Sequence, residues 1–99
     1  MSTEDRQAAQ RRLNDLIDLL RRLPSQQEPL AGLIQEAEAL ARAISAFHLE
    51  GIRFRMYNVD RMVHQPPVSL PAEAAAIVAD VHKHLEAAGF HTRSHQAPG

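Results

Sequence analysis

The sequence predicts a mainly helical α+β domain, in which an antiparallel helical hairpin is followed by a strand, a helix and a short strand. Over three long segments apolar residues recur at steps of three and four, the spacing of amphipathic helices. One segment after Gly51 instead alternates apolar and basic residues, which is the spacing of a strand. Only 4% of the residues are aromatic, so Leu, Ile, Val and Ala must build the core, and this composition suits helices.

The first two predicted helices, Glu4–Leu23 and Pro29–Leu49, form the hairpin. Pro24 ends the first helix, and Pro29 suits the first position of the second. The polar connector between them is short, which favours antiparallel neighbours. Gly51 is expected to stop the second helix.

The next segment, Ile52–Val59, is predicted to be a strand. Its apolar and basic residues alternate in the order Ile52, Arg53, Phe54, Arg55 and Met56. An all-α three-helix bundle is the alternative, because Ile52, Met56 and Val59 also fall at helical spacing. In that alternative the second helix continues past Gly51.

A proline-rich stretch leads to the third predicted helix, Pro71–Ala88. Gly89 follows at the place where a left-handed residue ends a helix, and Phe90 can fold back on Leu85 as in a Schellman ending. Phe90–Ser94 is predicted to add a short second strand.

Length and composition bound the class of protein. The 99 residues predict one small domain over 1–99, with frayed ends at 1–3 and 96–99. The net charge of -1 provides no global field for nucleic acid or an anionic membrane. Without cysteine the chain has no disulfide, thiolate zinc site or cysteine nucleophile, which fits a reducing cytoplasm. No apolar run is long enough for a membrane span, so we expect a cytoplasmic protein without membrane contact.

No catalytic residue is assigned and no cofactor is expected, because the chain has neither a nucleophile motif nor a glycine-rich phosphate loop. Asp60 and His64 would form an acid–base pair only if a pocket formed around Pro66 and Pro67. The predicted function is therefore a small non-enzymatic interaction protein that forms a homodimer and docks a protein partner. The apolar stripe of the hairpin is wider than one neighbouring helix needs. Its candidate partner-binding residues are Leu13, Leu16, Leu20, Leu23 and Ile34.

Two other functions remain open. The first is a small nucleic-acid-binding regulator, in which arginines contact phosphates and a tyrosine stacks on a base. Its residues would be Arg53, Arg55, Tyr57 and Arg61. The second is a metal-dependent activity, suggested by six histidines and by pairs of ligands four residues apart. Its candidate ligands are Asp80, His84, His91 and His95.

Overall fold

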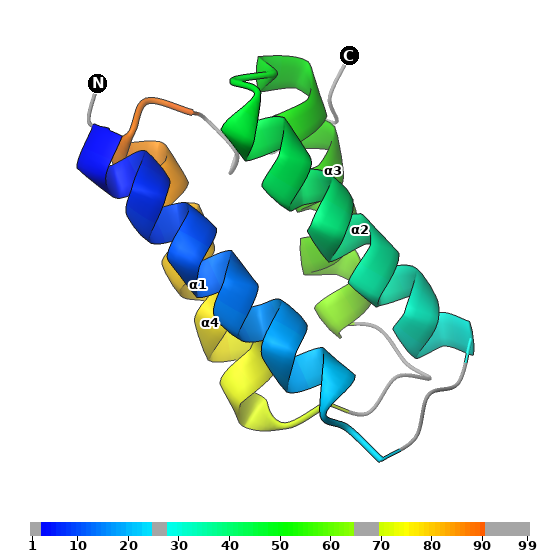
Figure 1. The fold of residues 1–99 in the computed structure, drawn as a ribbon. Helices are drawn as coiled ribbons and strands as arrows, with labels where there is room; N and C mark the ends of the chain where they lie inside the picture. Colours follow the sequence, from blue (N-terminus) through cyan, green and yellow to red (C-terminus); the bar gives the residue numbers. More distant parts are fainter. Residues whose placement is uncertain (1–2, 25–27, 65–69, 91–99) are drawn as a thin grey trace.

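Four helices account for most of residues 3–24, 28–64 and 70–90, the parts of the chain that the computed structural model describes. They are α1 (Thr3–Arg21), α2 (Glu28–Ser45), α3 (Leu49–His64) and α4 (Ala72–Ala87). Consecutive helices run antiparallel, so the chain goes up and down through a four-helix bundle (Figure 1). None of the described helices combines the length and the apolar composition that crossing a bilayer requires.

The bundle consists of two layers of paired helices. α1 packs most extensively against α4, and α2 packs most extensively against α3 (Figure 1). α1 also contacts α2 and α3 contacts α4, which closes the ring of neighbours. Each helix therefore buries one stripe against two others, which is why apolar residues recur at steps of three and four.

The core is almost entirely aliphatic. The largest fully buried side chains come from all four helices: Leu13, Leu16, Leu20, Leu33, Leu40, Ile44, Ile52, Met56, Val59, Ile77, Val78 and Leu85. Burying one such side chain stabilises the fold by about 1.5–3 kcal/mol relative to leaving it in water. The low aromatic content is thus matched by a core that is built from leucine, isoleucine and valine.

The predicted strand Ile52–Val59 is wrong, because these residues lie inside α3. Ile52 and Met56 are fully buried, whereas Phe54 between them is 48% exposed. A strand would have placed all three side chains on one face, whereas in a helix Phe54 points away from the other two. The described residues contain no strand, so the α+β class is also wrong and the all-α alternative fits.

That alternative still differs from the structure in one respect, because the chain breaks before α3 instead of continuing through Gly51. Phe47 has a φ of 56°, in the left-handed region. Its amide donates to the carbonyl of Ile44 (3.2 Å), and the amide of His48 donates to the carbonyl of Ala43 (3.0 Å). These two bonds are those of a Schellman ending. The helix thus ends with a phenylalanine in the position that glycine usually occupies.

The predicted end of the last helix is confirmed. Gly89 has a φ of 98°, and its amide donates to the carbonyl of Glu86 at 3.0 Å. The amide of Phe90 donates to the carbonyl of Leu85 at 2.8 Å, and both side chains belong to the core. Phe90 is not in a strand, and the rest of the predicted strand Phe90–Ser94 lies outside the described residues.

The bounds of the three predicted helices need small corrections. The observed helices begin or end a few residues from the predicted bounds: Thr3–Arg21 for Glu4–Leu23, Glu28–Ser45 for Pro29–Leu49, and Ala72–Ala87 for Pro71–Ala88. The largest shift is the early end of α2, which is caused by the left-handed Phe47.

Candidate functional site

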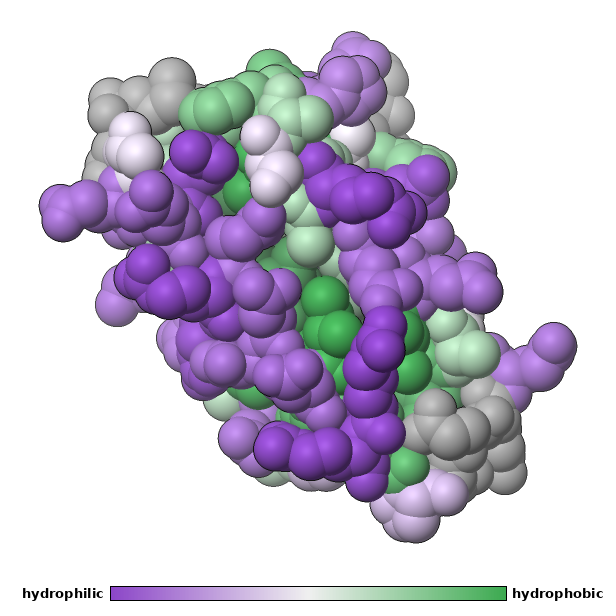
Figure 2. Space-filling model, viewed as in Figure 1, coloured by the Kyte–Doolittle hydropathy of each residue, from purple (hydrophilic) through white to green (hydrophobic). Residues whose placement is uncertain are grey.

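The clearest surface feature is a group of large apolar side chains that remain exposed where α2 passes into α3. Among the described residues these are Phe47 (53% exposed), Leu49 (49%), Phe54 (48%) and Tyr57 (49%). In Figure 2 apolar residues are visible at the top, over this end of the bundle, and also in the seam between α1 and α2, while hydrophilic side chains cover the outer faces of these two helices. An exposed apolar group with a polar surround is typical of an interaction surface.

A groove of about 560 Å³, which Phe54 lines, lies between the second half of α2 and the first half of α3. Its lining residues are Ala39, Arg42, Ala43, His48, Glu50, Gly51, Arg53, Phe54 and Arg55. Small side chains let the two helices approach closely, because a Cβ atom on Gly51 would lie 3.3 Å from the Cβ of Ala43. We call this feature the α2–α3 groove.

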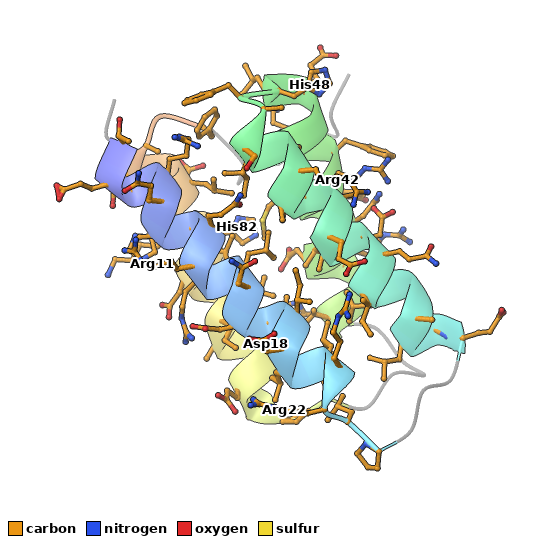
Figure 3. The ribbon with its side chains drawn as sticks, viewed as in Figure 1. Arg11, Asp18, Arg22, Arg42, His48 and His82 are labelled. Carbon is orange, nitrogen blue, oxygen red and sulfur yellow. The ribbon has the colours of Figure 1, made fainter. Side chains whose placement is uncertain are left out.

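His48 caps the first turn of α3 at one end of the groove. Its Nδ1 accepts a hydrogen bond from the amide of Gly51 at 3.1 Å, so the imidazole serves as the N-cap. A Cβ atom at Gly51 would lie 2.4 Å from the same Nδ1, so the ring occupies space that only glycine leaves open. Figure 3 shows His48 at the end of the bundle where α2 and α3 meet.

The charge of the α2–α3 groove is locally positive. Its lining includes three arginines, and Glu50 is the one acid among them. Arg55 donates to Glu36 at 2.7 Å, and its guanidinium lies 5.2 Å from the ring centre of Phe54. Arg42 and Arg53 have no hydrogen bond or ion pair with any residue that the structure describes. Within the described part of the chain, two guanidiniums, one from each helix, therefore have no partner that would compete with a bound anion.

Phe47, whose backbone is left-handed, contacts a side chain of α1. The guanidinium carbon of Arg6 lies 4.1 Å from the centre of its ring, which is a cation–π contact. A non-glycine residue in this backbone region is strained by roughly 1–2 kcal/mol. Strain of this kind is often retained at functional sites, so Phe47 adds to the case for this end of the bundle.

The predicted partner-binding residues lie mostly inside the protein. Leu13, Leu16 and Leu20 are fully buried, and their neighbours are core residues of the same chain. Leu23 and Ile34 are half-buried and pack against that core. The fourth helix explains the width of the stripe, because α1 contacts α4 as well as α2. The homodimer itself stays a prediction.

Three of the predicted nucleic-acid-binding residues share one face of α3. Arg53, Tyr57 and Arg61 are four residues apart, and the Arg61 guanidinium carbon lies 5.9 Å from the Tyr57 ring centre. Arg55 is turned toward α2, where it binds Glu36. The helix thus brings three of these side chains together and separates the fourth.

The predicted metal ligands have other partners in the described part of the chain. Asp80 accepts a hydrogen bond from Nε of Arg12 at 3.0 Å, and this bond, helped by Asp15, raises the pKa of Arg12. Nδ1 of His84 lies 3.3 Å from a carboxylate oxygen of Asp5. No three histidine, aspartate or glutamate side chains gather as metal ligands within residues 3–24, 28–64 and 70–90. His91 and His95 lie outside the described residues.

The possible acid–base pair does come together, with a third residue that the sequence analysis missed. Nδ1 of His64 lies 3.3 Å from Oδ1 of Asp60, and Nε2 of the buried His82 lies 3.8 Å from the same oxygen. His82 comes from α4, so it couples α3 to α4 through this carboxylate. These residues do not line the α2–α3 groove.

The groove itself was not predicted from the sequence. Its one visible signal was the set of small residues on facing helices, Ala39, Ala43 and Gly51, which indicates a close helix–helix approach. Comparison of the chain with family models, with curated proteins and with solved structures finds no match. A function for this protein therefore has to be inferred from the geometry of the groove.

Proposed function

We propose that this protein is a non-enzymatic interaction module that docks a protein partner in the α2–α3 groove. The observation that carries the proposal is the run of exposed large apolar side chains from the turn before α3 to the middle of α3, of which Phe54 lines the groove: Phe47, Leu49, Phe54 and Tyr57. Elsewhere in the described chain the large apolar residues belong to the core or pack against it. Aromatic and arginine side chains are also the types that protein interfaces favour.

Site-specific crosslinking tests this proposal. A photoreactive amino acid placed at Phe54 should yield a discrete protein adduct in the cytosol of the native host. The same amino acid placed at Ala79, an exposed position on α4, serves as the matched control and should yield none. Equal adducts from both positions, or no adduct from position 54, would reject docking at the groove. The lack of cysteine supports the cytoplasmic location that this experiment assumes.

Self-association remains part of the proposal, but it needs a surface outside the buried stripe of α1. Leu13, Leu16 and Leu20 have no exposed area to offer a second copy. A chain this small leaves much of its surface in water and gains stability from association. Sedimentation at high micromolar concentration measures the oligomer directly, and a strict monomer would reject self-association while leaving the docking proposal intact.

Nucleic-acid binding is the second candidate, and the shared face of Arg53, Tyr57 and Arg61 supports it. The net charge of -1 weighs against it, because such binding depends mainly on neutralised phosphates. A random single-stranded RNA should then bind the wild type more tightly than it binds an Arg61→Glu variant. The affinity of the wild type should fall as the salt concentration increases. Affinity that does not change between about 50 and 200 mM salt would reject this candidate.

A further inference from the structure

We infer that the partner presents an acidic peptide segment with an aliphatic side chain to the α2–α3 groove. The inference rests on the proposed function and names the chemistry that the docking partner must have. Two observations lead to it. The guanidiniums of Arg42 and Arg53 have no ion-pair partner among the described residues, and the exposed ring of Phe54 lies beside a floor of small residues.

The charges of the groove select an acidic segment. Arg42 comes from α2 and Arg53 from α3, so carboxylates on one bound segment can reach a guanidinium on either helix. Glu50 is the single opposing charge, whereas Glu36 is occupied by Arg55 and by Asn58, whose Nδ2 donates to it at 2.8 Å. Guanidinium and carboxylate groups form charge-assisted, often bidentate hydrogen bonds. An acidic partner would therefore gain attraction on approach and in the complex.

The same charges argue against a second copy of this chain as the occupant. In a symmetric dimer the same surface comes from both chains, so Arg42 and Arg53 would share one interface with the same two arginines of the other chain. Like charges placed together at an interface oppose binding. A separate acidic segment avoids this repulsion.

The shape of the groove selects an aliphatic side chain as the second requirement. The groove between the two helices is lined by the small residues Ala39, Ala43 and Gly51, and Phe54 provides an apolar wall that is 48% exposed. The volume of about 560 Å³ lies within the range of about 300–1,000 Å³ that is typical of ligand sites. A groove between two antiparallel helices is also the kind of surface on which an amphipathic peptide lies with its apolar side inward.

Three synthetic peptides test the inference with the full-length protein. The first carries glutamates around leucines at helical spacing, the second replaces each glutamate with lysine, and the third replaces each leucine with serine. Fluorescence anisotropy measures affinity, and amide chemical shifts locate the site. The first peptide should bind at least about tenfold more tightly than either of the others, the effect expected of two exposed ion pairs or a lost apolar anchor. It should shift the amides of Ala43, Gly51 and Phe54.

Charge reversal provides the matched control. The double variant Arg42→Glu/Arg53→Glu should lose about tenfold in affinity for the acidic peptide and gain affinity for the lysine peptide. Arg11→Glu/Arg22→Glu makes the same change in net charge on α1 and directly after its end, at exposed positions away from Arg42 (Figure 3), and should bind like the wild type. Helical circular dichroism of both variants shows that each remains folded.

The other outcomes separate this inference from the proposed function. Equal binding of the acidic and lysine peptides, with shifts in the groove, would overturn the acidic partner and leave docking in place. No binding of the acidic peptide at about 1 mM, or shifts only outside the groove, would also overturn the inference. Tighter binding of a random RNA than of the acidic peptide, lost in the groove variant, would replace the acidic protein with a nucleic acid. The proposed function itself fails if crosslinking from position 54 captures no partner, or captures no more than the control at position 79.

Discussion

Replacing Gly51 with alanine should destabilise this protein, although alanine is the better helix former. Gly51 lies in the first turn of α3, where its amide donates to Nδ1 of His48 at 3.1 Å. An added Cβ atom would lie 2.4 Å from that nitrogen and 3.3 Å from the Cβ of Ala43. The imidazole must therefore swing away, and the hydrogen bond that caps α3 is lost.

The expected size follows from two opposing effects. Alanine in place of glycine within a helix gains about 0.8–1.0 kcal/mol. Loss of an N-cap costs about 0.5–2 kcal/mol, and the tight contact with Ala43 adds to that cost. The net destabilisation of Gly51→Ala is therefore small, roughly 0–1 kcal/mol.

The same substitution in a His48→Ser variant separates the loss of the cap from the gain in helix propensity. Serine at position 48 can still cap the helix, and its short side chain leaves room for the new methyl group. In the His48→Ser background, Gly51→Ala should therefore stabilise the protein by up to about 1 kcal/mol. The two residues should then show a coupling energy of about 1 kcal/mol or more in a double-mutant cycle.

Urea unfolding followed by circular dichroism measures all four proteins of this cycle. A change of 1 kcal/mol should move the midpoint by roughly 0.5–1 M for a domain of this size. Gly32→Ala serves as the control, because its new Cβ would meet only Cε of Met62 at an ordinary 3.6 Å. It should stabilise both backgrounds equally. If Gly51→Ala also stabilises both equally, His48 does not cap α3 and the reasoning fails.

Three further outcomes are expected. Gly89→Ala should lower the free energy of unfolding by about 1 kcal/mol, because its φ of 98° strains any side chain; an unchanged urea midpoint would contradict this. Phe47→Gly should relieve backbone strain of roughly 1–2 kcal/mol, less the contact with Arg6, yet reduce crosslinking from position 54; full crosslinking would remove Phe47 from the docking surface. A double-mutant cycle on Arg12 and Asp80 should give a coupling energy of about 0.2–1 kcal/mol that decreases with added salt, and coupling that is insensitive to salt would speak against an exposed ion pair.

The helical part of the fold was predictable because burial against neighbouring helices leaves a period in the sequence. The strand prediction failed where one segment satisfied two periods. Ile52 and Met56 are four residues apart, so a helix buries both. Arg53 and Arg55 alternate with them for unrelated reasons, because the two arginines have different neighbours. Arg55 binds Glu36 on α2, whereas Arg53 lines the groove. These contacts come from packing between helices, which a local pattern does not contain.

Two glycines show how the same residue type can have different roles. Gly89 was correctly predicted to end a helix, because it is followed by Phe90, an apolar residue that can fold back on the core. Gly51 was expected to do the same, but the left-handed position belongs to Phe47 instead. Phenylalanine rarely adopts a left-handed backbone conformation, so the sequence did not indicate that α2 ends at this residue. The groove that this break creates could not be predicted from the sequence for the same reason.

The case for function at the α2–α3 end comes from choices that stability alone would not favour. Glycine at position 47 would remove the strain of a left-handed phenylalanine, and a polar residue there would avoid exposing 53% of the side chain. Sequences that fold well are locally consistent, and the places where they are not are commonly functional sites. Phe47 directly precedes His48, which lines the groove together with Arg42 and Phe54, and a docking surface at this end explains its strain and exposure better than an accident of packing would.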